Sequence, residues 1–587
     1  MPRTNKVIMT GNEGMARGAY ESGATFASAY PGTPSTEILE NLASYDEIYA
    51  EWAPNEKVAL ESAIGASLAG ARSIASMKHV GVNVALDPFM AFAYTGVNGG
   101  LVVISADDPG MHSSQNEQDN RNLAPFAKIP MLEPSDSQES KILMKKAFEI
   151  SEEFDTPVLF RVTTRISHSR SIVEKEERNE YKLKSYTKDP QKYCMVPANA
   201  RRRRLIVEEN MKGLKEYTNN FKYNRIEWSK SKDIGIITSG VSYQYVKEAF
   251  GDSVNILKLT MTYPLPEKLI SDFCEKVEKV YVVEELDPYL ETQIKAMGFD
   301  VTGKEIMPDI GELTPSIIKE AITGETKEKA HEGYDSLPIR PPIMCAGCPH
   351  RGVYHAITKL KGVVTGDIGC YSLGLAPPLS ALDSVVCMGA GVSMAHGFKK
   401  VYEDNDIQDK PVIGVIGDST FLHSGVTSLM NIVYNESNPT IVILDNRTTA
   451  MTGHQPNFAV GKNAKGGDAP QIQIDSLCRS LGIKNVFNVD AYDLEEIEAA
   501  LKKGIDLKDE PAVIVARRPC VLLKGQKPSG QYAINQDKCT QCKLCLRIGC
   551  PSIQIEDDNI IIDEASCVGC SVCSQVCNFE AIEKVGE

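Results

Sequence analysis

Two evenly spaced runs of cysteine near the C-terminus restrict the fold of this chain more than any other feature. Each run has three cysteines separated by two residues, and a fourth cysteine follows a few residues later. The runs are Cys539, Cys542, Cys545 and Cys550, and then Cys567, Cys570, Cys573 and Cys577. The N-terminal sequence MPRTNKVIMTGNEG does not look like an export signal, so we expect a cytoplasmic, reducing compartment. There, clustered thiols indicate metal ligands or redox centres rather than disulfides.

This double pattern is typical of bacterial ferredoxin modules with two 4Fe–4S clusters, in which the last cysteine of each run binds the other run's cluster. We therefore predict one cluster on Cys539, Cys542, Cys545 and Cys577, and a second on Cys567, Cys570, Cys573 and Cys550. Two details depart from the usual pattern. Four residues separate Cys545 from Cys550, and Asn578 stands where proline is usual. A pair of four-thiolate zinc sites is the alternative.

The remaining chain alternates short apolar runs with helix-like segments, as α/β proteins do. Its 587 residues are too many for one core. We expect three doubly wound α/β domains and a C-terminal α+β module of ferredoxin type. The predicted α/β domains are 1–170, 230–335 and 336–527, the last opening with a Pro-rich linker, 336–344; a polar connector spans 171–229, and the cysteine-rich module is 528–587.

The composition argues against two classes of function. The formal net charge is −15, whereas general nucleic-acid binders need basic surface to meet phosphates. No apolar run reaches the ~20 residues that cross a membrane. The one basic run, Arg201 to Arg204, is interpreted as a solvated or interdomain face.

A polar residue follows each of two apolar runs in the last α/β domain. Asp418 follows PVIGVIG and Asn446 follows TIVILD, with one helix-length segment between them. This spacing predicts two parallel strands joined by a crossover helix, with both side chains at the carboxyl edge of the sheet, where α/β folds bind ligands. Asp418, the amide oxygen of Asn446 and the carbonyl of Thr448 suit Mg²⁺, which takes about six oxygen ligands, some from phosphates.

This pattern fits a site for thiamine diphosphate and Mg²⁺. Gly417 would let the backbone approach the diphosphate, and a helix starting near Ser419 would direct its N-terminus toward it. An ordinary strand end and turn is the alternative. Further glycine-rich turns favour the cofactor site: GDIGCYSLG, with Gly366 and Asp367, and CMGAGVSMAHG.

Taken together, the motifs resemble those of the 2-oxoacid:ferredoxin oxidoreductases, and most closely the large (alpha) subunits of the indolepyruvate type. The matching stretches are YPGTPSTEI, NEKVALESAIGASLAGAR, MKHVGVNVALDPFM, SADDPGMHSSQNEQDNR, CAGCPHRG, GDIGCYSLG, the GDS and DN motifs and the terminal cysteines. The resemblance implies a pyrimidine-binding domain over 1–170, a transketolase C-terminal-like domain over 230–335 and a diphosphate-binding domain over 336–527.

The resemblance also implies a reaction. An aryl pyruvate such as indolepyruvate or phenylpyruvate reacts with coenzyme A to give an aryl-acetyl-CoA and CO₂, and ferredoxin is reduced. The implied partners are ferredoxin and a smaller beta subunit on a separate chain, in a heterodimer that itself dimerises. The alternatives are a sister enzyme for phenylglyoxylate or pyruvate, a non-oxidative thiamine decarboxylase, and an electron-transfer subunit that has lost catalysis.

Three catalytic residues follow from the resemblance. Glu56, in APNEKVALE, matches the glutamate that lies beside the aminopyrimidine ring in thiamine enzymes, with Glu61 as the fallback. A glutamate that only offsets a helix dipole is the alternative for Glu56. Thr33, in YPGTPST, resembles the contact to the substrate carboxylate, and Arg121 is a plausible partner because guanidinium suits a carboxylate. The alternatives are a helix cap for Thr33 and a surface charge for Arg121.

Four further cysteines lie in or beside the turns of the last α/β domain: Cys345, Cys348, Cys370 and Cys520. In related oxidoreductases, cysteines at similar places hold a 4Fe–4S cluster next to the thiamine. We therefore predict a third cluster, which would take electrons from the substrate one at a time. A zinc site with His350 or His355, a redox Cys-x-x-Cys and plain buried thiols are the alternatives.

Overall fold

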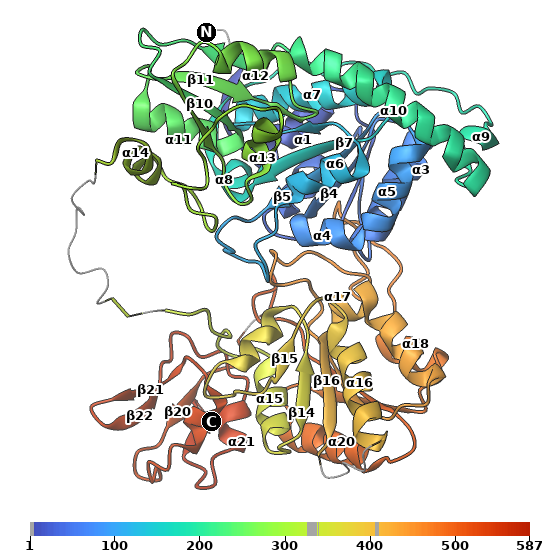
Figure 1. Ribbon diagram of the computed structural model, residues 1–587. Helices are drawn as coiled ribbons and strands as arrows, with labels where there is room; N and C mark the ends of the chain where they lie inside the picture. Colours follow the sequence, from blue (N-terminus) through green and yellow to red (C-terminus); the bar gives the residue numbers. More distant parts are fainter. Residues whose placement is uncertain (1–4, 326–336, 339, 405–409, 527, 587) are drawn as a thin grey trace. The chain divides into compact units, whose positions relative to one another are not determined.

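A computed structural model describes residues 5–325, 337–338, 340–404, 410–526 and 528–586. The chain forms two compact units, Met1–Asp335 and Ser336–Glu587 (Figure 1). The predicted Pro-rich linker, 336–344, falls at this boundary, although residues 336 and 339 lie outside the described residues. In the part of the chain that the structure describes, no helix is long and apolar enough to cross a membrane.

A seven-stranded sheet forms the centre of the first unit, in the order β12-β6-β7-β5-β4-β2-β3. Every neighbouring pair is parallel except β12 with β6. The predicted apolar runs form fully buried central strands, as expected for a parallel sheet covered on both faces. The strands are β2 (Phe26–Ala29), β3 (Tyr49–Trp52), β4 (Ser73–Lys78), β5 (Leu101–Asp107), β6 (Met131–Leu132), β7 (Val158–Thr163) and β12 (Met261–Tyr263).

Helices cover both faces of this sheet. On one face pack α1 (Gly11–Glu21), α2 (Thr36–Ala43) and α7 (Ser137–Glu153). On the other pack α3 (Glu56–Leu68), α4 (His79–Val84) and α5 (Leu86–Thr95). Shorter elements are the antiparallel pair β1 (Lys6–Thr10) and β8 (Arg170–Glu174), together with η1 (Asn120–Asn122), α6 (Leu123–Ala127) and α8 (Thr164–His168).

The second sheet of this unit has four strands in the order β13-β10-β11-β9. Its hydrophobic core is continuous with that of the first sheet: Val103 of β5 and Leu257 of β11 belong to one buried cluster. The segments predicted as separate domains, 1–170 and 230–335, therefore share a core, and β12 of the later segment also pairs with β6 of the first sheet. The elements are β9 (Arg225–Glu227), β10 (Ile234–Ser239), β11 (Asn255–Leu259), β13 (Lys279–Val283), α11 (Gly240–Phe250), α12 (Glu267–Cys274), α13 (Tyr289–Ala296) and α14 (Pro315–Thr323).

The predicted connector, 171–229, is more regular than its composition indicates. It contains α9 (Pro190–Tyr193) and the 23-residue helix α10 (Pro197–Asn219). Val207, Met211 and Leu214 of α10 are buried at helical spacing, so a narrow apolar stripe anchors an otherwise charged helix. Within the basic run, Arg203 is also buried, and it pairs with Asp155 at 2.8 Å.

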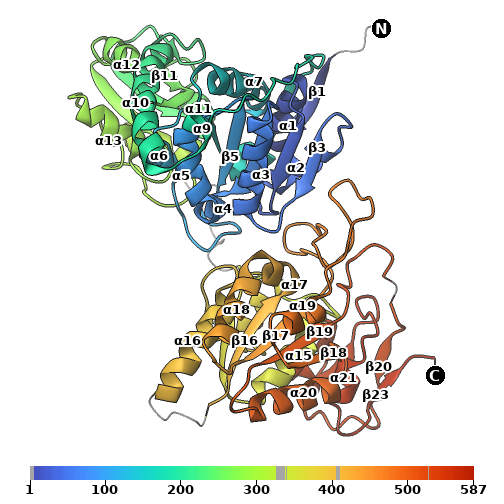
Figure 2. The ribbon, with the colours of Figure 1, turned by 90° about the vertical axis from the view of Figure 1, so that its right-hand side faces the viewer.

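The second unit contains a six-stranded, fully parallel sheet in the order β15-β14-β16-β17-β19-β18 (Figure 2). One face packs against α16 (Ala390–Asp404), α18 (Val426–Tyr434) and α19 (Ile474–Ser480), and the other against α15 (His350–Thr358) and α20 (Leu494–Asp506). The predicted pair of parallel strands with a crossover helix is confirmed as β16, α18 and β17. The strands are β14 (Val363–Gly366), β15 (Ser384–Val385), β16 (Val412–Gly417), β17 (Thr440–Asp445), β18 (Asn485–Asp490) and β19 (Ala512–Arg517).

The cysteine-rich segment forms a small module with two antiparallel strand pairs, β20 (Tyr532–Ile534) with β23 (Ile582–Lys584) and β21 (Ile553–Glu556) with β22 (Asn559–Ile562). Two short helical turns accompany them, η5 (Leu544–Ile548) and α21 (Val572–Gln575). Ile548 and Val572 are buried in the core that lies under α15 and α20. The module therefore packs on that face of the second unit.

Candidate active site

The residues predicted to bind Mg²⁺ lie together at the carboxyl edge of the second unit's sheet. Asp418 follows β16 directly and begins a continuous helix of three parts, α17 (Asp418–Thr420), η4 (Phe421–Gly425) and α18. Asn446 follows β17, the neighbouring parallel strand. Asp418, Asn446 and Thr448 are all buried, so the fold isolates them from bulk water.

Three oxygen atoms converge at this edge. The amide oxygen of Asn446 lies 3.2 Å from Oδ1 of Asp418 and 2.8 Å from the carbonyl oxygen of Thr448. Octahedral Mg²⁺ with bonds of about 2.1 Å places neighbouring oxygens about 3 Å apart. If the amide were turned over, its nitrogen would donate hydrogen bonds to both oxygens. The orientation with oxygen inward is therefore favourable when a cation lies between them, and the three groups fit Mg²⁺.

The electrostatics of Asp418 also favour a bound cation. Its Oδ2 accepts a hydrogen bond of 2.9 Å from Asn457 Nδ2. Burial, and then the nearby carboxylate of Asp445, raise the pKa of Asp418 to about 7. A cation bound at this point would favour the charged form of Asp418 and offset the cost of burying it.

The glycine-rich turns pack closely at this edge and are held there by hydrogen bonds. A β carbon on Gly417 would lie 2.4 Å from the ring of Tyr371, so close packing of that ring requires glycine here. Asp367 accepts hydrogen bonds from the backbone N–H groups of Ile368, Gly389 and Gly391, at 2.8–2.9 Å. Its carboxylate thus holds the start of α16 in place, even though burial raises the pKa of Asp367 to about 6.

The other predicted cofactor residues lie at the same edge. Gly366 ends β14, and a β carbon there would lie 2.9 Å from the side chain of Leu382. Ser419 is buried, and its hydroxyl accepts a hydrogen bond of 2.9 Å from Thr449.

The four cysteines of the predicted third cluster, here called the inner thiols, are brought together beside the predicted Mg²⁺ ligands. They are Cys345, Cys348, Cys370 and Cys520. Burial raises the pKa of Cys370 to about 11, and the thiols of Cys520 and Cys345 raise it further. Burial also raises the pKa of Cys348 to about 12, with Cys370 and Cys345 again contributing. The backbone N–H of Cys520 donates to the carbonyl oxygen of Asn446 at 2.9 Å, which links the two groups directly.

Three histidines lie near the inner thiols or on the adjoining helix. Nε2 of His454, which the sequence analysis did not single out, is 3.8 Å from Sγ of Cys520. His350 is buried edge-on against Tyr371, with ring centroids 5.7 Å apart, and burial lowers its pKa to about 4. His355 is on α15, and burial lowers its pKa.

The eight terminal cysteines are grouped as two interleaved sets. The outer thiols, Cys539, Cys542, Cys545 and Cys577, line one small cavity. The middle thiols are Cys550, Cys567, Cys570 and Cys573; burial raises the pKa of Cys573, and the other three raise it further. Each set draws its last member from the other run. Among the described residues, no three His, Cys, Asp or Glu side chains surround one point as ligands of a single metal ion would.

In the first unit, the predicted catalytic residues also lie at the carboxyl edge of a sheet. Thr33 follows β2, and Glu56 follows the neighbouring strand β3 as the first residue of α3. Glu56 is only 5% exposed, whereas the side chain of Glu61 is 45% exposed and pairs with Lys57. A β carbon on Gly81 would lie 2.6 Å from Oε1 of Glu56, so α4 packs directly on this carboxylate. Burial favours Glu56 over Glu61 for a role in the site.

A lysine that the sequence analysis missed lies at the same edge. Lys78 ends β4, the other neighbour of β2, and is 8% exposed. Its Nζ donates to the carbonyl oxygen of Ser113 at 2.6 Å, and the Ser113 hydroxyl lies 3.5 Å from the carbonyl oxygen of Thr33. Burial lowers the pKa of Lys78 to about 8, although the carboxylate of Asp108 opposes that shift. A buried cation therefore lies beside the Thr33 loop.

Arg121 is placed differently from its prediction. It is 1% exposed, and its guanidinium pairs with Asp119 at 2.5 Å and with Glu284 at 2.7 Å. It also donates to the carbonyl oxygens of Glu285 and Asp287. These contacts connect η1 to the loop after β13. The arrangement favours a structural role for Arg121 over the predicted contact with a substrate carboxylate.

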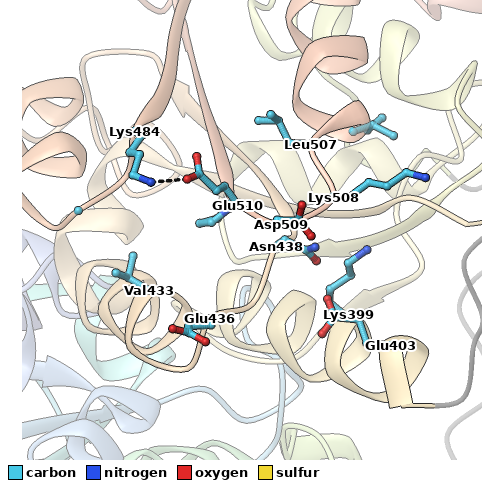
Figure 3. Close-up of a pocket in the computed structure, with 13 residues that line it drawn as sticks. Lys399, Glu403, Val433, Glu436, Asn438, Lys484, Leu507, Lys508, Asp509 and Glu510 are labelled. Atoms are coloured by element: carbon cyan, nitrogen blue, oxygen red, sulfur yellow. Dashed lines mark hydrogen bonds and ion pairs between the residues drawn. The ribbon is translucent and has the colours of Figure 1, made fainter.

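A pocket of about 890 Å³ lies elsewhere in the second unit (Figure 3). Asn438, Lys484 and Glu510 line it from the segments that precede β17, β18 and β19, and Lys484 pairs with Glu510. The pocket is therefore at the amino edge of the sheet, opposite Asp418 and Asn446, and is not part of the candidate active site.

Comparison with known proteins identifies the family. Residues 17–234 match the family described as pyruvate flavodoxin/ferredoxin oxidoreductase, thiamine diP-binding. Residues 367–516 match the C-terminal TPP-binding domain of thiamine pyrophosphate enzymes. Indolepyruvate oxidoreductase subunit IorA of Pyrococcus abyssi is 40% identical, over 99% of this chain and 97% of the relative. The chain belongs to the IorA family. The subunit of that name from Methanothermobacter marburgensis is 42% identical, over 100% and 98% of the two chains.

This IorA-family chain is also related to other 2-oxoacid enzymes. The 2-oxoglutarate synthase subunit KorA of Archaeoglobus fulgidus is 25% identical, over 47% of this chain and 87% of the relative. The predicted family and the class of enzyme, an oxidoreductase with thiamine-diphosphate-binding domains, are confirmed.

Proposed function

We propose that this IorA-family chain is the large subunit of an enzyme that oxidatively decarboxylates aryl pyruvates with coenzyme A and reduces ferredoxin. The observation that carries the proposal is the single sheet edge that holds both the oxygen ligands for Mg²⁺ and the inner thiols. The hydrogen bond between Cys520 and Asn446 joins the two groups. Such an edge combines a cofactor site with an electron acceptor, as an oxidative reaction requires.

The residues of the second unit would hold the cofactor. Asp418, Asn446 and Thr448 would supply three ligands of Mg²⁺, and the diphosphate and a water would complete the shell. When bound, thiamine diphosphate would supply a nucleophilic carbon for the decarboxylation of the oxoacid. Glu56 of the first unit would hold a proton at the aminopyrimidine ring. Thr33 would position the substrate carboxylate.

The inner, middle and outer thiols would each hold a 4Fe–4S cluster, with the middle and outer clusters in a ferredoxin-type module. Electrons would leave the substrate singly and pass to external ferredoxin. A smaller beta subunit would complete the enzyme, and pairs of such heterodimers would associate.

The third cluster gives a direct prediction for iron content. Protein purified without oxygen should contain about 12 iron atoms per chain, as three 4Fe–4S clusters require. The double variant Cys370→Ser/Cys520→Ser should contain about eight, because its inner cluster lacks two ligands. Iron and acid-labile sulfide analysis measures both. Eight iron atoms in the unaltered protein would remove the third cluster.

Lys78 gives a prediction about substrate binding and pH. As the cation beside Thr33, it would bind the carboxylate of the oxoacid, and Lys78→Gln should raise KM about 10- to 100-fold. Because the pKa of Lys78 is about 8, KM for the unaltered enzyme should rise as pH increases through 8 and the lysine loses its charge.

The matched variant is Lys78→Arg, which stays charged at every pH tested and should remove the rise. Initial rates at several pH values test this directly. The same alkaline rise in KM in the Lys78→Gln variant would exclude Lys78 as its source.

The proposed reaction is tested by anaerobic viologen reduction with the chain co-purified with its partner, with and without coenzyme A. The substrates would be indolepyruvate, phenylpyruvate, phenylglyoxylate, pyruvate and 2-oxoglutarate. Coenzyme-dependent reduction with the aryl pyruvates alone is expected. Reduction with another oxoacid only would assign the chain to a sister activity. Release of aldehyde without reduction would contradict the oxidative reaction.

A further inference from the structure

The ferredoxin-like module is attached to the α/β domain next to the inner thiols. Gly347, in the turn between Cys345 and Cys348, packs so tightly on the module that a β carbon there would lie 2.0 Å from Cγ2 of Val568. The hydroxyl of Tyr492, in the loop before α20, donates to the carbonyl oxygen of Gly347 at 2.6 Å. The two cysteine-bearing loops, 345–348 and 567–570, thus lie against each other.

Arg351 bridges the same two parts of the unit. Its Nη2 donates to the carbonyl oxygens of Met344 and Cys345, at 2.7 and 3.1 Å. Its Nη1 donates to the carbonyl oxygens of Ile548, at 3.0 Å, and Gly549, the residue before Cys550. One guanidinium therefore joins the turn that carries inner thiols to the loop that carries a middle thiol.

The environment of this guanidinium is unusual. Arg351 is 4% exposed, and among the described residues none carries a carboxylate that pairs with it. Its Nε is buried without a hydrogen-bond partner in the described part of the chain. Buried charges are normally paired, and buried donors are normally bonded, because leaving either unsatisfied costs free energy. An anionic group that accepts from Nε would satisfy both requirements.

Thiols of both sets lie near this cation. The backbone N–H of Arg351 donates to the carbonyl oxygen of Cys348, which carries an inner thiol, at 3.2 Å. A β carbon on Gly549, the residue before the middle thiol Cys550, would lie 3.3 Å from Nη1 of Arg351. The guanidinium therefore lies between loops that carry thiols of both sets.

We propose that Arg351 is a positioning residue that fixes the separation of the inner and middle clusters and raises the reduction potentials of both. The inference rests on the proposed function, which supplies the two clusters. Four thiolates give a reduced 4Fe–4S cluster a net negative charge, and a fixed cation stabilises that charge most where water is excluded. In the transfer between them, one electron leaves the inner cluster, which is oxidised, and enters the middle cluster, which is reduced. No bond is formed or broken.

Two substitutions separate the effect of the positive charge of Arg351 from the effect of its hydrogen bonds to the two loops. Arg351→Gln removes the charge, so the potentials of the inner and middle clusters should both become more negative while that of the outer cluster stays unchanged. Arg351→Lys keeps the charge but cannot span four carbonyl oxygens, so the potentials should stay close to those of the unaltered protein. The magnetic interaction between the reduced inner and middle clusters should then change, because their separation is no longer fixed.

The experiment is an anaerobic redox titration of the full chain followed by electron paramagnetic resonance, with iron content measured for every sample. The matched control is Arg547→Gln, which removes an exposed arginine from the ferredoxin-like module and should shift none of the potentials, because water screens its charge.

Unchanged inner and middle potentials in an Arg351→Gln protein with full iron would overturn the proposal. An equal shift of all three clusters would also overturn it, since that indicates a general disturbance. Eight iron atoms in the unaltered protein would remove the inner cluster and the proposal with it. The viologen assay reports separately on the proposed function, so the two failures can be distinguished.

Discussion

Asp418→Ala is expected to lower oxoacid-dependent viologen reduction by about 10³-fold, because Mg²⁺ coordination contributes several kcal/mol and each 1.36 kcal/mol is a factor of ten in rate. Asp418 is the one carboxylate among the three converging oxygen groups. Without it, the amide of Asn446 can turn over and donate to the carbonyl oxygen of Thr448, which leaves a neutral site. Titration with thiamine diphosphate and Mg²⁺ should show weakened binding of both.

Two further variants make this result specific. Asp418→Asn keeps the size of the side chain and an oxygen that accepts from Asn457, so the fold should survive while metal binding falls. Asp468→Asn changes an aspartate of the same unit whose side chain is 93% exposed, and it should have full activity. An Asp418→Asn enzyme with normal Mg²⁺ affinity and normal turnover would show that the cation binds elsewhere.

Glu56→Gln is expected to reduce turnover about 10²- to 10⁴-fold, the usual contribution of a positioned proton-transfer group. The amide has the same shape but cannot hold the proton that the aminopyrimidine ring exchanges. Binding of thiamine diphosphate should persist, because the Mg²⁺ ligands are on the other unit of the chain. Single-turnover kinetics together with cofactor titration separate the two effects.

Glu61→Gln is the matched control for that variant. Glu61 is on the same helix, but its side chain is 45% exposed, so its removal should change turnover less than twofold, since exposed pairs contribute little. Full turnover with Glu56→Gln and a large loss with Glu61→Gln would reverse the assignment.

The sequence places the second unit's candidate residues at one sheet edge because its signals are local. Asp418 and Asn446 each follow an apolar run, and parallel strands bring both to one edge. Cysteine spacing is informative for the same reason: the two terminal runs predict interleaved sets, and the structure groups the thiols in that way. The role of Gly417 is harder to predict from the sequence, because it depends on the ring of Tyr371, 46 positions earlier in the chain.

The first unit shows what sequence patterns do not contain. Lys78 lies beside the predicted substrate contact only because β4 ends beside the Thr33 loop and because Ser113 folds back onto it. Three segments that are distant in the sequence must pack together before this lysine can be distinguished from the other lysines of the chain. Arg121 illustrates the converse: the sequence suggests a substrate carboxylate as its partner, whereas in the structure its guanidinium pairs with the protein's own Asp119 and Glu284. Buried ion pairs of this kind need tertiary structure to be recognised.

The shared core of the first two predicted domains is hard to predict for a similar reason. Strand β12 comes from the later segment but adds to the first sheet beside β6, and one hydrophobic core includes both sheets. Turn residues and composition mark where elements end, but they do not show which elements share a core. The helix α10 was missed because three apolar residues in a charged segment give only a weak periodic signal.

If the proposed function holds, the cofactor edge and the cysteine clusters form one electron-transfer unit. The most direct test mixes the anaerobic enzyme, loaded with thiamine diphosphate and Mg²⁺, with an aryl pyruvate in the absence of any external acceptor. The visible absorbance of the iron–sulfur clusters is then followed over time. Rapid bleaching that requires the oxoacid, and that is lost in Asp418→Asn, is the predicted result. Release of CO₂ with no change in cluster absorbance would contradict the proposed electron transfer.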